Sequence, residues 1–197
     1  MMKKIFTASL IFLCLSSAFA QKIYHNKGFG ITIEIPQTWW EDNRNGFPAE
    51  IELSKTERKK ILDDSNSVFL TLFYDRETIK EGGNYIPKMQ FNVASNYEKD
   101  FKVLLKATEN NVKIQKKFQP DYKLVKKPKE VKIAGIKSIG YVATYSMMVN
   151  GKTTTIRSFT YVIPYNNYVF HLNFTDEING KDRSKEFEAA VKTIKIG

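Results

Sequence analysis

The chain contains 197 residues, with 31 Lys and Arg against 21 Asp and Glu, and carries a formal net charge of +10. This length is enough for one domain with a substantial hydrophobic core, so we expect folding without disulfides. The only cysteine, Cys14, lies near the start of the chain, which excludes a cysteine nucleophile and a thiolate metal site from the remainder.

The first twenty residues have the pattern of a secretory signal peptide. Lys3 and Lys4 precede an apolar run, and Ala18-Phe19-Ala20 has the small residues of a cleavage site. We therefore expect removal of residues 1–20 and one exported domain over residues 21–197. No later stretch approaches the roughly 20 apolar residues of a membrane helix. The mature chain is expected in the periplasm or outside the cell, without a transmembrane helix.

Alternating apolar residues predict the first strands. The stretch 29–35 places one Phe and three Ile side chains on the same face, and Pro36 ends it. Shorter strands are predicted at 50–53 and 87–93. The stretch 68–74 is apolar on both faces apart from one threonine, which is typical of a central strand that is covered on both sides.

Trp39 and Trp40 lie in the segment between the first two predicted strands, which we expect to be a loop because it is rich in turn-forming residues. Two adjacent large aromatic side chains cannot easily face the same interior. We expect Trp39 in the core and Trp40 only partly covered. Exposed tryptophan is enriched at binding surfaces, so Trp40 is a candidate partner-binding residue.

Two capping boxes predict helices. Ser54 with Glu57 precedes a short helix at 57–62, and Ser95 with Glu98 precedes a longer, amphipathic one. The inward-facing residues of the longer helix, at helical spacing, are Phe101, Leu104, Leu105, Thr108 and Val112.

A strongly basic segment follows the second helix. Residues 113–137 hold nine lysines against two acidic residues, a net charge of +7. We expect irregular chain here, with short extended pieces at 123–125 and 131–133. Its positive potential would attract an acidic protein face, an anionic polymer or a lipid surface. The candidate partner-binding lysines are Lys113, Lys116, Lys117, Lys123, Lys126, Lys127 and Lys129.

Two considerations limit what the basic segment can do. Arginine is absent from it, and lysine supplies point charges rather than bidentate contacts, which argues against sequence-specific nucleic-acid binding. The alternative to a binding role is a solvated face that serves solubility only.

The C-terminal part is predicted to be a meander of three strands between 138 and 175. Asn150-Gly151 joins the first two through a type I′ turn, because both residues tolerate positive φ. Residues 164–167 form the next turn. An amphipathic helix containing Phe187 and Ile194 closes the chain.

Candidate catalytic and metal-binding residues are scarce. His171 falls on the more polar face of the last predicted strand, and we interpret it, like His25, as a hydrogen-bonded structural residue; a metal ligand or general base is the alternative. The adjacent acidic pairs at 41–42 and 63–64 are read as solvated charges. Phosphate-binding, dinucleotide and hydrolase motifs are missing, so no catalytic, cofactor-binding or metal-binding residue is assigned and no cofactor is expected.

Several stretches together resemble the PsbP and Mog1-like family: FGITIEIPQTWW, YIPKMQFNV, VKIAGIKSIGYVATYSM, YVIPYNNYVFHLNFT and the closing FEAAVKTIKI. The sharpest elements are the proline and tryptophan after the first strand and the Ala-Gly turn before the meander. The resemblance implies an α+β fold, a central and mostly antiparallel sheet flanked by helices in an α/β/α sandwich. Members of the family are generally accessory or binding proteins, and the chain resembles the exported bacterial members of unassigned role.

These observations lead us to expect a non-enzymatic, exported accessory or binding protein that meets an envelope protein or another anionic component. Two alternatives remain. One is a carrier of a small molecule, which would need a deep, aromatic-lined pocket. The other is a hydrolase or isomerase that uses His171 with tyrosines and carboxylates in a cleft.

Overall fold

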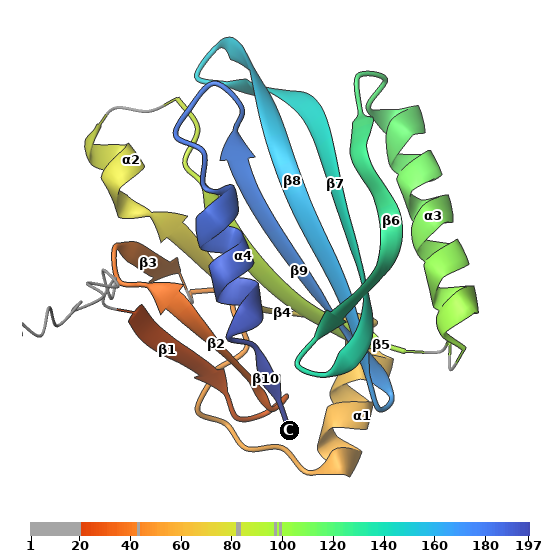
Figure 1. Ribbon diagram of the computed structural model, residues 1–197. Helices are drawn as coiled ribbons and strands as arrows, with labels where there is room; N and C mark the ends of the chain where they lie inside the picture. Colours follow the sequence, from red (N-terminus) through yellow and green to blue (C-terminus); the bar gives the residue numbers. More distant parts are fainter. Residues whose placement is uncertain (1–20, 43, 82–83, 97, 99) are drawn as a thin grey trace, which may run out of the picture.

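The computed structural model describes residues 21–42, 44–81, 84–96, 98 and 100–197 (Figure 1). The expected signal peptide, residues 1–20, lies outside the described residues. These described residues form a seven-stranded antiparallel sheet, a second sheet of three strands, and four helices. The helices are α1 (Lys55–Ser65), α2 (Arg76–Lys80), α3 (Phe101–Phe118) and α4 (Ser184–Lys192).

The strand order of the large sheet is β3-β4-β5-β9-β8-β7-β6, and that of the small sheet is β1-β2-β10. The large sheet contains β3 (Trp39–Asp42), β4 (Ser67–Asp75), β5 (Lys88–Ser95), β6 (Lys123–Ile133), β7 (Ile136–Val149), β8 (Lys152–Tyr165) and β9 (Tyr168–Glu177). The small sheet contains β1 (Gln21–Asn26), β2 (Ile31–Pro36) and β10 (Lys195–Ile196).

The two faces of the large sheet are covered by different layers. On one face, the small sheet and α4 enclose the main core, in which Ile33 and Phe187 meet the phenylalanines of β4, β5 and β9. On the other face, Leu104 of α3 packs against Val162 and Val169. Figure 1 shows α4 lying across the sheet and α3 running beside β6 and β7. The α+β architecture with a mainly antiparallel sheet between helices, predicted from the sequence, is confirmed.

Two predictions that depend only on residues close in sequence, a helix capping box and a tight turn, are confirmed. Ser54 and Glu57 form the predicted capping box: the Glu57 carboxylate accepts the Ser54 N–H at 2.7 Å, and the Ser54 hydroxyl accepts the Glu57 N–H at 3.2 Å. Asn150 and Gly151 have φ of 48° and 77°, as a type I′ turn requires.

Three predictions at the edges of the sheets are wrong. Residues 50–53 form no strand; instead Trp39–Asp42 is a strand, because it pairs with the free edge of β4. The basic segment contains one continuous strand, Lys123–Ile133, rather than irregular chain with short extended pieces, because β7 supplies its backbone partners. β4 is not a central strand, since only β3 separates it from the edge.

Both ends of the chain contain strands that the sequence did not reveal, and the second capping box is wrong. Ser95 belongs to β5, where it pairs with Tyr168, and α3 begins instead after Asp100, whose carboxylate accepts the Lys102 N–H at 2.6 Å. β1 precedes the first predicted strand. At the other end, α4 stops at Lys192 and β10 follows it, pairing with β2.

A buried ionic network fastens α4 to the large sheet. Arg183 is only 2% exposed, and its guanidinium contacts the fully buried carboxylate of Asp75 on β4 and Glu186 at 2.7 Å. The Arg183 N–H donates to Asp176 at 3.0 Å, and Arg157 contacts that same carboxylate at 2.6 Å. The network therefore joins β4, β8, β9 and the start of α4.

None of the helices in the described part of the chain has both the length and the apolar character needed to cross a membrane.

Candidate functional site

The seven candidate lysines lie on two neighbouring elements, the last turns of α3 and the edge strand β6. We call this group of residues the lysine surface: Lys113, Lys116, Lys117, Lys123, Lys126, Lys127 and Lys129. All seven are exposed, and within the described residues none has a carboxylate within 4.0 Å. Two apolar side chains of the same segment, Phe118 and Val125, are 80% and 58% exposed. The surface therefore combines unpaired positive charge with exposed apolar groups.

Part of the lysine surface has a structural explanation. β6 is an edge strand, with register irregularities between Leu124 and Lys126 and between Lys126 and Lys129, and with Pro128 inside it. Lysines, bulges and proline on an edge strand prevent pairing with the edge of another molecule. Edge protection thus accounts for the lysines of β6. It accounts neither for the lysines on α3 nor for the exposed Phe118.

Trp40 does not belong to this surface, because β3 and β6 are the opposite edges of the large sheet. The predicted division between the two tryptophans is confirmed for burial: Trp39 is 1% exposed and Trp40 is 57% exposed. The Trp40 ring contacts the Arg76 guanidinium, whose central carbon lies 4.6 Å from the ring centroid. Any binding role of Trp40 would be separate from that of the lysines.

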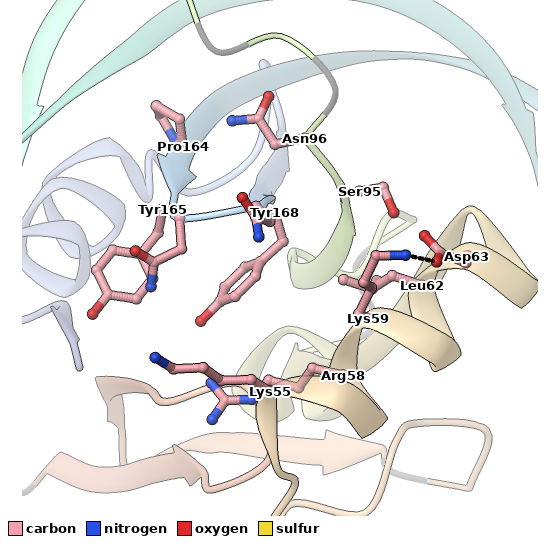
Figure 2. A pocket seen from close by; sticks show the side chains of 12 residues that line it. Lys55, Arg58, Lys59, Leu62, Asp63, Ser95, Asn96, Pro164, Tyr165 and Tyr168 are labelled. Carbon is pink, nitrogen blue, oxygen red and sulfur yellow. Dashed lines mark hydrogen bonds and ion pairs between the residues drawn. The ribbon is translucent and has the colours of Figure 1, made fainter.

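A second candidate site is a pocket of about 650 Å³ between α1 and the turn that joins β8 to β9 (Figure 2). Figure 2 shows Lys55 and Arg58 on one side, with the hydroxyl ends of Tyr165 and Tyr168 pointing toward them. We call it the cationic pocket. It is lined by Lys55, Arg58, Lys59, Leu62, Asp63, Ser95, Asn96, Pro164, Tyr165, Asn166, Asn167 and Tyr168.

The backbone around the cationic pocket is held in place on both sides. The capping box at Ser54 sets the start of α1, and the Asn96 N–H donates to the Asn167 carbonyl at 2.8 Å, which ties the end of β5 to the turn. The Tyr168 hydroxyl donates to the Phe29 carbonyl at 3.2 Å. Burial raises the pKa of Tyr168, and the nearby Arg58 acts in the opposite direction. Tyr168 therefore stays neutral at ordinary pH.

The sequence interpretation missed this pocket, although a signal was present. Lys55, Arg58, Lys59 and Leu62 stand at positions i, i+3, i+4 and i+7 of α1, which share one helix face. A helix normally turns apolar residues inward at this spacing. Here three of the four residues are cationic, so this helix face carries positive charge at positions that are usually apolar.

A smaller pocket of about 260 Å³ lies beside the buried ionic network. Two of its lining cations are already paired, Arg183 with Glu186 at 2.7 Å and Lys181 with Glu77 at 3.6 Å. These two cations therefore already have carboxylate partners within the protein.

In the described residues no three His, Cys, Asp or Glu side chains gather to hold a metal ion. His25 lies on β1, and its Nδ1 is 2.7 Å from the Thr32 hydroxyl, which agrees with the structural interpretation. His171 lies on β9 opposite Asn92 and Val162. The hydrogen bond expected for the His171 side chain is not found with any described residue.

His171 gives the protein a predicted pH dependence. Burial lowers the pKa of its imidazole, so below a pH of about 6.5 the unfolded chain binds more protons than the folded one. Stability therefore falls as the pH falls, by at most about 1.4 kcal/mol per pH unit from this group. Urea unfolding at several pH values should show that the free energy of unfolding falls less steeply with falling pH in His171→Gln than in the wild-type protein. Equal slopes for both proteins would contradict this assignment.

Solved structures match this chain, whereas comparisons of its sequence find no match. No family model matches the chain, and no curated protein sequence matches it. CyanoP, the PsbP of Synechocystis, is similar in structure with a TM-score of 0.54 at 10% identity, over 91% of this chain and 94% of CyanoP.

Two further solved structures are similar over nearly the whole chain. LpqN of Mycobacterium tuberculosis has a TM-score of 0.52 at 15% identity, covering 89% of this chain and 90% of LpqN. Mog1p of Saccharomyces cerevisiae has a TM-score of 0.51 at 8% identity, covering 91% of this chain and 96% of Mog1p. The resemblance drawn from the sequence is confirmed at the level of architecture: this chain has the PsbP/Mog1-like fold.

Proposed function

We propose that the protein is an exported, non-enzymatic accessory or binding protein, with residues 21–197 as its mature domain, and that it contacts an acidic partner protein through the lysine surface. The observation that carries the proposal is the lack of a carboxylate partner, among the described residues, for any of the seven lysines, beside the exposed Phe118. Such a surface repels itself in the free protein, and an acidic partner would relieve that repulsion.

The exposed apolar groups favour a protein as partner over a polymer or a lipid surface. Phe118 and Val125 can enter apolar pockets of a partner, while the surrounding lysines select acidic surroundings and speed the encounter. Support also comes from similar structures: Mog1p is described as a Ran-binding protein, and LpqN as involved in cell envelope biogenesis. The envelope is accordingly the proposed place of action.

Binding to fluorescent poly-L-glutamate, a simple acidic polypeptide, tests the proposal. We expect the variant with Lys116, Lys117, Lys126 and Lys127 changed to Glu to lose at least about tenfold in affinity at low salt. Glutamate keeps the edge strand charged, so edge protection survives in this variant.

The matched control changes Lys60, Lys185, Lys192 and Lys195 to Glu, which alters the net charge equally at exposed positions elsewhere. It should keep most of the affinity. Equal losses of affinity in both variants would contradict the proposal, because they would show that poly-L-glutamate responds only to the net charge of the protein. Tighter binding to vesicles of anionic lipid than to poly-L-glutamate would point to a membrane surface instead.

A further inference from the structure

We infer that the cationic pocket between α1 and the β8–β9 turn binds a small organic anion that carries a carboxylate or phosphate group. This site is separate from the lysine surface. Figure 1 places α1 at one end of the long strands, and the C-terminal end of α3 with the start of β6 at the other end. A soluble ligand and a partner protein could therefore be bound at the same time.

The first argument is the charge that the protein leaves unbalanced in the pocket. Lys59 is paired with Asp63, the one acidic residue of the lining. Lys55 and Arg58 have no carboxylate within 4.0 Å in the part of the chain that the structure describes. Two cations that face the same pocket without a counter-ion create a local positive potential, which an anion entering the pocket would neutralise.

The second argument is the incomplete hydrogen bonding of Arg58. Its Nη2 donates to the Leu53 carbonyl at 3.1 Å, the guanidinium also interacts with the Tyr168 hydroxyl, and its Nε is buried without an acceptor among the described residues. Arginine presents five N–H donors in a planar fork that matches two oxygens of a carboxylate or phosphate. The protein uses only part of this fork, so donors remain for the oxygens of a ligand.

The third argument concerns the rest of the ligand. The volume of about 650 Å³ lies within the range of small-molecule sites, roughly 300–1,000 Å³. The half-buried Tyr165 ring and Pro164 offer apolar contact, while Asn96, Asn166 and Asn167 offer amide donors and acceptors. This lining fits an organic body with polar substituents, such as a sugar acid or a sugar phosphate, better than a bare inorganic ion.

Backbone amide NMR of isotope-labelled residues 21–197 tests the inference with three probes that share one hexose ring: D-glucuronate, D-glucose 6-phosphate and neutral D-glucose. At about 20 mM an anion with a Kd near 1 mM fills more than nine-tenths of the site. We expect at least one anion to shift the amide signals of α1 and of residues 165–168, and glucose to leave them unchanged. The anion that shifts these signals shows whether the pocket recognises a carboxylate or a phosphate group.

Two matched variants separate a specific site from general attraction. Arg58→Gln removes the charge and the guanidinium fork but keeps a polar side chain, and it should weaken binding by at least about tenfold. Lys60→Gln removes an equal charge from an exposed position of α1 outside the pocket and should leave the affinity unchanged. A dispersed amide spectrum of each variant confirms that it is folded.

Three results would overturn the inference. Neither anion shifts the signals at this concentration; glucose shifts them as strongly as the anions do; or Arg58→Gln and Lys60→Gln weaken binding equally. None of these results bears on the lysine surface, because the four-lysine variant tests that surface independently.

Discussion

Replacement of Arg183 by methionine is expected to lower the free energy of unfolding by about 3–5 kcal/mol. The change leaves Asp75 fully buried without its cationic partner and removes the attachment of α4 to β4. Native domains are stable by only about 5–15 kcal/mol, so this variant should unfold at a much lower urea concentration. Fluorescence of the buried Trp39 reports the transition.

The network can be tested against two comparisons. Arg44→Met removes an ion pair with Asp42 whose arginine side chain is 83% exposed, and should not move the urea midpoint measurably. The double variant with Asp75→Asn and Arg183→Met no longer buries an unpaired carboxylate. Its loss in the free energy of unfolding should therefore be smaller than the sum of the losses of the two single variants. A loss below about 1 kcal/mol for Arg183→Met alone would show that the network is not a major anchor.

Truncation of Phe187 to alanine is the second change with a large expected effect, a loss of about 3–5 kcal/mol. The ring is fully buried and meets Trp39, Phe159 and Phe174, with centroids 5.9, 5.6 and 5.4 Å away. These contacts hold α4 on the main core. The variant would leave a cavity between α4 and the three strands β3, β8 and β9 of the large sheet.

The same substitution at Phe118 provides the control, because that ring is 80% exposed. Phe118→Ala should change stability by no more than about 0.5 kcal/mol. Similar urea midpoints for the two alanine variants would show that the packing of α4 on the main core contributes little to stability.

Sequence reasoning succeeded where the deciding interactions are local. The Ser54 capping box and the Asn150-Gly151 turn depend on residues at most three positions apart, and both formed as predicted. Pairing along sheet edges depends on distant partners. Trp39–Asp42 could be recognised as a strand only once β4 was known to present a free edge, and the lysines of β6 hid a strand because its alternation is weak.

The functional features divide in the same way. The lysines were visible as a run of charge, and the structure adds that they are exposed on α3 and β6, without a carboxylate within 4.0 Å among the described residues. The Arg183 contact with Asp75 spans 108 residues, so no spacing rule could suggest it. The cationic pocket likewise needs α1 and the β8–β9 turn together. Only its helical half, Lys55 to Leu62, was present as a pattern in the sequence.

Crosslinking in the native cell envelope is the most direct test of a binding role through the lysine surface. The wild-type protein is compared with the variant carrying Glu at Lys116, Lys117, Lys126 and Lys127, and with the equally charged control variant. We expect one acidic protein to be captured by the wild type and the control and to be lost by the lysine-surface variant. Capture of the same protein by all three, or by none, would contradict the proposed role.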